Sequence, residues 1–176
     1  MWTKWNDIEK AYINEKSYYG VYKIRMVNNS GYPIEIQRVG GNDKEGIIYI
    51  GRAKPNYTLS KRIQQFTNVA INMRLDSHSG AETFVLMRMI LECKDKANPN
   101  NNLQYQVLRI NSDKVQVDIN NIENIRKQVK NEEIKALAEY FIEFSELPPC
   151  NSSITGKWSQ FSKLVEQYWK NQQKQM

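Results

Sequence analysis

Polar and hydrophobic positions alternate along parts of the chain in a way that predicts three strands. Tyr18–Val27 and Leu103–Ile110 alternate with a period of two, and Gly46–Gly51 is a short apolar run bounded by glycines. Turn-forming residues at 28–33 precede a further alternating stretch, Ile34–Val39, which would lengthen a hairpin. The sequence therefore predicts a small, mostly antiparallel sheet.

Apolar residues at helical spacing predict helices after the second strand. A short helix is expected over Thr58–Phe66. Ser79 and Glu82 form a capping box ahead of the apolar run Phe84–Cys93, which indicates a largely buried helix.

Further helices are expected in the second half of the chain and at both ends. An apolar stripe runs over 122–144, with a break near Asn131 that suggests two helices. Segments 1–17 and 152–176 are expected to add helices at the two ends. The predicted fold class is α+β, with a three-stranded sheet flanked by helices in a single domain, residues 1–176.

Composition narrows the class of protein without giving a function. The chain has 176 residues, of which 40% are hydrophobic, and its net charge of +6 suits a polyanionic partner. Cys93 and Cys150 stand in no metal-ligand spacing, so a reducing, cytoplasmic compartment is expected. The first residues do not form a signal peptide, and no apolar run reaches about 18 residues, so no contact with a membrane is expected.

Four short motifs stand in a fixed order on these predicted elements. They are Gly20-Val21-Tyr22 and Tyr49-Ile50-Gly51 on the first two strands, Leu59-Ser60-Lys61-Arg62 on the helix that follows, and Glu139 ahead of Pro148 and Asn151. This arrangement resembles the GIY-YIG nuclease superfamily over residues 20–151, which gives an expected core of 18–151. The resemblance implies a metal-dependent DNA endonuclease.

The chemistry of phosphodiester hydrolysis gives the matched residues their expected roles. Glu139, a hard oxygen ligand on a helix, would hold Mg²⁺ or Mn²⁺. The guanidinium of Arg62 matches phosphate geometry and would bind the scissile phosphate. The spacing to Asn151 selects Glu139 over three neighbouring glutamates, which are interpreted as surface residues: Glu132, Glu133 and Glu143.

The two motif tyrosines are the candidates for activating water. The resemblance favours Tyr22 as general base and Tyr49 as a hydrogen-bonding group at the phosphate or water, although the two roles can be exchanged. A phenol has an ordinary pKa near 10 and works as a base only where cations stabilise its phenolate. The local sequence supplies Lys23, Arg52, Lys54 and Arg62.

Some positions depart from the family pattern. Arg52 stands where the family often has lysine, and ten residues separate Gly51 from Arg62, a longer stretch than is usual. Arg52 or Lys61 would therefore share the role of Arg62. The expected phosphate or DNA contacts are Arg52, Lys54, Lys61 and Asn151, the last of which would also support the site.

The only histidine of the chain, His78, is a further candidate. It resembles an extra histidine that some family members place near the phosphate, where it would relay a proton or contact phosphate. Many members carry a histidine or tyrosine one helical turn after the motif arginine, and that position here is Phe66.

The expected function is DNA cleavage. Among DNA-cleaving enzymes, a restriction endonuclease is the first expectation, and it would act as a homodimer on a two-fold site. Two other classes are compatible with the sequence: a catalytically silent nucleic-acid-binding module on the same fold, and an interaction protein that uses its aromatic terminal helices. The enzyme requires Tyr22, Tyr49, Arg62 and Glu139 to meet in one basic groove. The interaction protein requires an exposed apolar patch and no such groove.

Overall fold

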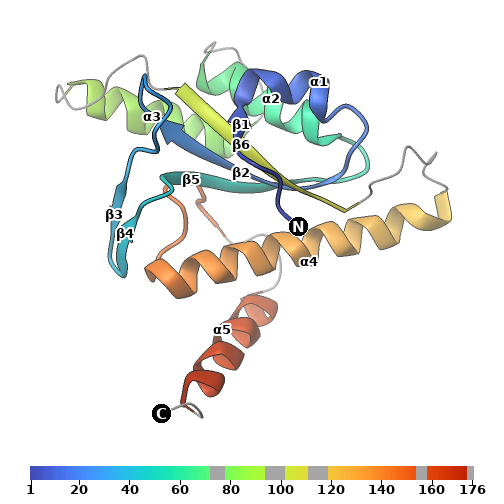
Figure 1. Cartoon of the computed structure of the whole chain (residues 1–176). Helices are drawn as coiled ribbons and strands as arrows, with labels where there is room; N and C mark the ends of the chain where they lie inside the picture. The colour runs from blue at the N-terminus through green and yellow to red at the C-terminus, as the bar shows by residue number, and fades with distance from the viewer. Residues whose placement is uncertain (72–77, 94–101, 111–118, 154–157, 174–176) are drawn as a thin grey trace.

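The computed structural model describes residues 1–71, 78–93, 102–110, 119–153 and 158–173, which form an α+β fold (Figure 1). The elements in chain order are β1 (Asn6–Asp7), the 3-10 turn η1 (Ile8–Lys10), α1 (Ala11–Asn14), β2 (Gly20–Val27), β3 (Ile36–Arg38), β4 (Gly41–Asp43), β5 (Ile47–Ala53), α2 (Leu59–Ala70), α3 (Ser79–Cys93), β6 (Asn102–Arg109), α4 (Ile119–Phe144) and α5 (Trp158–Gln173). None of the described helices has the length and hydropathy that a membrane span requires.

The larger sheet separates two layers of helices. Its four strands are antiparallel in the order β1-β6-β2-β5, and β3 pairs with β4 in a separate two-stranded sheet. Helices α1, α2 and α3 lie on one face and α4 crosses the other, while α5 leads away from α4 (Figure 1). The central strand β2 is therefore covered on both faces: Val21 packs in the α4 core, and Tyr22 and Ile24 pack in the α2 core.

Helix α2 shows how local sequence fixes an element beside the sheet. The Thr58 side chain accepts a hydrogen bond from the backbone N–H of Lys61 at 3.3 Å and caps the helix. Leu59, Ile63 and Phe66 recur at helical spacing and are fully buried in the core between α2 and the sheet. The first turn of α2 is therefore held close to the end of β5.

The N-terminal segment differs from the helix expected over 1–17. Helical structure starts only at Ile8, because the preceding residues run extended beside β6. The Thr3 N–H donates to the Val107 carbonyl at 2.9 Å, and Asn6 pairs with β6 to give the short fourth strand. The larger sheet therefore has four strands, one more than the three predicted.

Two other boundaries also differ from the sequence prediction. Helix α4 continues through Asn131, where a break was expected, because one exposed asparagine costs a helix only about 0.7 kcal/mol. The stretch Ile34–Val39 contributes β3, which pairs with β4 and not with the larger sheet. The C-terminal addition contains α5, and residues 154–157 and 174–176 of that expected helix lie outside the described part.

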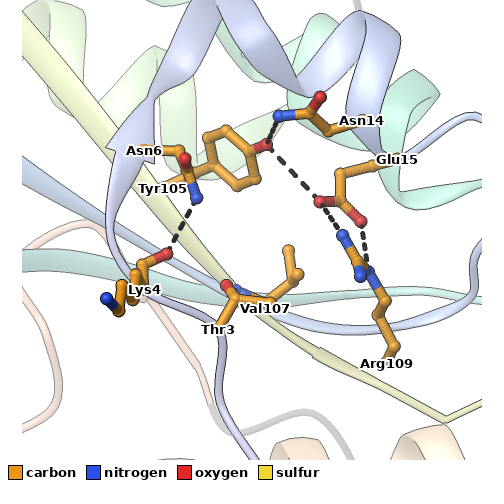
Figure 2. A network of polar contacts seen from close by, with 8 residues as sticks. All are labelled: Thr3, Lys4, Asn6, Asn14, Glu15, Tyr105, Val107 and Arg109. Carbon is orange, nitrogen blue, oxygen red and sulfur yellow. Dashed lines mark hydrogen bonds and ion pairs between the residues drawn. The ribbon is translucent and has the colours of Figure 1, made fainter.

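A buried ion pair fixes the end of α1 to β6 (Figure 2). The Glu15 side chain is 2% exposed and receives two hydrogen bonds from Arg109, at 2.8 and 2.9 Å. The Tyr105 hydroxyl donates to the same carboxylate at 3.4 Å and accepts from Asn14 at 3.3 Å. The Glu15 carboxylate is therefore hydrogen-bonded by two side chains, as a buried polar group requires.

We expect Arg109→Met to lower the free energy of unfolding by about 2–3 kcal/mol, because it leaves a carboxylate buried without its cation. Glu15→Gln should cost about 1 kcal/mol, since the Arg109 side chain is 34% exposed and can turn to water. Urea unfolding of both variants and of the double variant measures the difference. Equal losses in the two single variants would contradict this explanation.

Candidate functional site

A pocket of about 350 Å³ opens where the end of β5 meets the first turns of α2 and α3 and one side of α4. Its walls come from parts of the chain that lie far apart in sequence. They carry cations, phenols, a hydroxyl and a carboxylate: Tyr49, Arg52, Lys54, Tyr57, Arg62, Ser79 and Glu133. Positive charges outnumber negative charges among these described residues, which suits an anionic ligand.

The register of β2 and β5 places Tyr22 and Tyr49 side by side. Tyr22 is opposite Gly51, and Ile24 is opposite Tyr49, so both tyrosines lie on the α2 face of the sheet. Their ring centroids are 5.9 Å apart, with 46° between the ring planes. Tyr49 lines the pocket, whereas Tyr22 is fully buried and does not. Tyr49 is therefore the phenol that a ligand in the pocket would meet.

Two glycines make room for the ring of Tyr49. A Cβ on Gly51 would lie 2.5 Å from Cε1 of Tyr49 and 2.9 Å from the hydroxyl oxygen of Tyr22. A Cβ on Gly80, in the first turn of α3, would lie 2.3 Å from Cε2 of Tyr49. The ring can lie between the backbones of β5 and α3 only because neither position carries a side chain.

We expect Gly80→Ala to lower the melting temperature, although alanine is the better helix former by about 1 kcal/mol. The added methyl group would push the Tyr49 ring aside, and overpacking of this kind costs about 1–3 kcal/mol. Differential scanning calorimetry measures the effect, with Glu82→Ala, an exposed position in the same helical turn, as the control. A Gly80→Ala protein more stable than the wild type would show that the ring moves aside freely.

His78 connects the start of α3 to Tyr22. Its Nε2 lies 2.9 Å from the Tyr22 hydroxyl, and its Nδ1 accepts a hydrogen bond from the Ala81 N–H at 3.3 Å. A nitrogen that accepts carries no hydrogen, so in the neutral ring Nε2 donates to Tyr22. The Tyr22 hydroxyl then keeps its own hydrogen, and the Tyr49 ring lies beside it with 5.9 Å between the ring centroids. The histidine is 2% exposed and is not among the residues that line the pocket, whereas a place beside the phosphate was expected from the sequence. Its Nε2 instead lies within hydrogen-bond distance of the Tyr22 hydroxyl.

The capping box expected at Ser79 and Glu82 is replaced by this histidine. Helix α3 begins at Ser79 itself, and the His78 carbonyl accepts from the N–H groups of Ala81 and Glu82 at 2.9 and 3.0 Å. The exposed Ser79 side chain instead lines the pocket.

Burial keeps both phenols protonated in the free protein. It raises the pKa of Tyr22 well above its ordinary value of 10, and the nearby Tyr49 adds to this shift. Burial also raises the pKa of Tyr49 to about 12, assisted by the negative charge of Glu133 and opposed by Arg62 and the hydrogen bond with Tyr22. Arg62 favours the phenolate of both tyrosines, whereas each tyrosine's effect on the other raises the pKa of Tyr22 and lowers that of Tyr49, so Tyr49 is the more readily ionised of the two.

Three expected phosphate ligands do line the pocket: Arg52, Lys54 and Arg62. Nε of Arg52 lies 3.4 Å from Oε2 of Glu133, and Nη1 of Arg62 donates to Oε1 of Gln65 at 2.7 Å. The long connection before Arg62 therefore does not keep it from the pocket.

The other two expected DNA contacts, Lys61 and Asn151, lie elsewhere. Nζ of Lys61 lies 4.9 Å from the centroid of the Tyr57 ring, outside the pocket lining. The Asn151 side chain accepts from the Ile50 N–H at 2.9 Å and donates to the Ile50 carbonyl at 2.8 Å. Since both ends of its amide are bound to β5, Asn151 supports the strand that carries Tyr49, and it is not among the residues that line the pocket.

The carboxylate in the pocket is Glu133 and not the predicted Glu139. Glu133 is 3% exposed, whereas Glu139 is exposed and lines two other hollows, one beside Trp2 and one beside Lys23. Six residues of α-helix rotate a side chain by about 240° and advance it by about 9 Å, so the two carboxylates point to different sides of α4. The glutamate selected by the spacing to Asn151 therefore lies outside this pocket. The expected meeting of Tyr22, Tyr49, Arg62 and Glu139 in one groove is not what the described residues form, because only Tyr49 and Arg62 of the four line the pocket.

The pocket contains one carboxylate, and this restricts which kinds of metal ion it can bind. No group of three or more His, Cys, Asp or Glu side chains gathers anywhere in the described ranges. Mg²⁺ nevertheless binds proteins through one or two carboxylates, with waters and substrate phosphates as its other ligands. Glu133 with a bound phosphate fits that pattern, whereas zinc sites need three or four protein ligands.

Comparisons with protein-family models, with curated proteins and with solved structures found no match to this chain. The function of the pocket is therefore inferred from its own residues and geometry.

Proposed function

We propose that this protein is a metal-dependent DNA endonuclease that hydrolyses a phosphodiester bond in the pocket around Tyr49. The observation that carries the proposal is the meeting of Tyr49, Arg62 and Glu133 in one pocket, together with Arg52 and Lys54. A phenol, a carboxylate and several cations are the groups needed to activate water, bind a metal ion and bind phosphate. The resemblance of the motifs to those of GIY-YIG nucleases supports the same function.

Substrate binding begins at the cations. Arg62 and Lys54 bind the phosphate oxygens, and Arg62 is oriented by its hydrogen bond to Gln65. Arg52 is shared, since the phosphate and the Glu133 carboxylate compete for its guanidinium. Substrate binding therefore draws Arg52 away from Glu133. Glu133 would hold Mg²⁺, and a bound ion would supply positive charge near the phosphate.

The attacking water gives its proton to Tyr49. Tyr49 first loses its own proton to the solvent in the pocket, and the surrounding cations stabilise the phenolate. The water oxygen then forms a bond to phosphorus as the bond from phosphorus to the leaving oxygen breaks. The leaving oxygen takes a proton from solvent, which balances the reaction. Tyr22, held by His78, lies beside Tyr49, where its hydroxyl lowers the pKa of Tyr49 and so favours the phenolate.

Plasmid cleavage by the purified protein tests this proposal. We expect supercoiled DNA to be nicked or linearised in Mg²⁺ or Mn²⁺ and to stay intact in EDTA. Arg62→Ala should lower the rate by about 10²–10³-fold, because it removes a group that stabilises charge on the phosphate. Lys16→Ala removes an exposed cation outside the pocket and should leave the rate unchanged.

The same assays distinguish the endonuclease from a catalytically silent DNA-binding module. Binding to DNA without cleavage in either metal, on linear, branched and single-stranded DNA, would favour the catalytically silent module. Absence of both binding and cleavage would overturn the proposal. Discrete fragments from plasmid DNA would support the restriction role expected from the sequence, because they require cleavage at specific sites.

A further inference from the structure

Tyr57 is an aromatic side chain at the edge of the cationic pocket that no step of the proposed hydrolysis uses. It is partly exposed and lines the pocket together with Arg52, Lys54 and Arg62. One face of its ring is covered by the ammonium group of Lys61, 4.9 Å from the ring centroid. A phenol ring therefore stands next to the groups that would hold a phosphate.

Several contacts fix the loop that carries this ring. The Tyr57 N–H donates to the Lys54 carbonyl at 2.8 Å, which closes a tight turn around Pro55. Asn56 accepts a hydrogen bond from Arg126 of α4 at 3.2 Å. Thr58, the next residue, caps α2. A ring held in this way loses little conformational entropy when a ligand packs on it.

We propose that Tyr57 is a stacking platform for a nucleobase beside the phosphate held in the pocket, and that the substrate is DNA with an unpaired base at this position. The inference rests on the proposed function and adds a substrate class to it. Tyrosine rings bind bases face to face in a way that tolerates any sequence. In a paired duplex both faces of a base are already stacked, so only an unpaired, terminal or flipped base can occupy the platform.

Binding of short DNA in EDTA tests this inference without cleavage. The probes are a fluorescent single-stranded 12-mer and an abasic strand of the same length, which keeps the phosphates and lacks the bases. Tyr57→Ala should weaken binding of the base-containing strand about tenfold and leave binding of the abasic strand unchanged. Tyr57→Phe, which keeps the ring, should bind both strands like the wild type.

The chain offers a matched control for the aromatic ring. Tyr12 of α1 is exposed and has Lys16 4.6 Å from its ring centroid, the same pair of groups outside the pocket. Tyr12→Ala should therefore not change the affinity for either strand. Tyr57→Leu keeps apolar bulk in the loop and serves in place of Tyr57→Ala if the latter has a lowered melting temperature.

Three results would overturn the stacking inference and leave the proposed function standing. They are an unchanged DNA affinity in Tyr57→Ala, equal losses of affinity in Tyr57→Ala and Tyr57→Phe, or equal losses of affinity for the two strands. The second result would assign the effect to the hydroxyl group, and the third to the phosphates. A wild-type protein that binds neither strand and cleaves no DNA would instead overturn the proposed function, and the inference with it.

Discussion

Replacing Glu133 by glutamine is expected to lower the rate of DNA cleavage by about 10²–10³-fold, while Glu139→Gln leaves it near the wild-type value. Both residues lie on α4, but only Glu133 lines the pocket that contains Tyr49 and Arg62. The amide of glutamine keeps the shape of the side chain and removes the charge that binds a divalent ion. The pair of variants therefore tests the position of the metal ligand on one helix.

Two further measurements distinguish lost catalysis from lost folding or binding. Calorimetric titration with Mn²⁺ should show binding to the wild type and to Glu139→Gln, and much weaker binding to Glu133→Gln. The affinity for DNA in EDTA should not fall in Glu133→Gln, because the change leaves Arg52 without a competing anion. A rate loss confined to Glu139→Gln would place the metal ion on the other side of α4.

The second large effect is expected from Tyr49→Phe, which removes the phenol oxygen from the pocket and keeps the ring. Loss of a general base lowers rates by about 10²–10⁴-fold. Tyr22→Phe should have a smaller effect, about tenfold, since it removes only a neighbouring hydroxyl that lowers the pKa of Tyr49, a contribution of about 1 kcal/mol. Single-turnover cleavage of a short DNA substrate measures both changes.

The pH dependence of kcat/KM tests whether Tyr49 acts as a base, because this quantity reports ionisations of the free enzyme. With a pKa of about 12 for Tyr49, the active phenolate is a minor species below that pH. Its fraction, and kcat/KM with it, should rise about tenfold per pH unit from pH 7 to 10. The residual activity of Tyr49→Phe should lack this slope. A flat wild-type profile would show that the protonated phenol acts as a hydrogen-bond donor.

The strands and the tyrosine pair were predictable because their determinants are local. Alternation places Tyr22 and Ile24 on one face of β2, and the apolar run around Ile50 identifies a buried β5. Once these two strands pair, the meeting of Tyr22 and Tyr49 follows from the register. Arg62 was predictable for a similar reason, since it lies in the first turn of the helix after β5.

Glu133 was not predicted to line the pocket, because a motif spacing was preferred to the helical pattern. Glu133 lies four residues after Val129 and four before Leu137, so it belongs to the buried side of α4. Glu139 lies off that side. The signal that was missed is a charged residue on the side of the helix where its neighbours, Val129 and Leu137, are buried.

Other features depend on contacts between distant parts of the chain that leave no local pattern. The hydrogen bond of His78 to Tyr22 joins residues 56 positions apart, and the pairing of Asn6 with Tyr105 joins the N-terminus to β6. Tyr57 lies in a loop without periodicity, and only the folded structure brings it beside Arg62.

The hydrogen bonds of Asn151 have a consequence for how copies of the chain can associate. β5 is an edge strand, and edge strands expose N–H and carbonyl groups that can recruit a strand from another molecule. Here the Asn151 amide takes both groups of Ile50, and the Cys150 N–H takes the Ile48 carbonyl at 2.9 Å. The chain thus shields this edge with its own backbone and one side chain. A dimer formed by continuing the sheet across β5 would therefore have to displace residues 150–151 first.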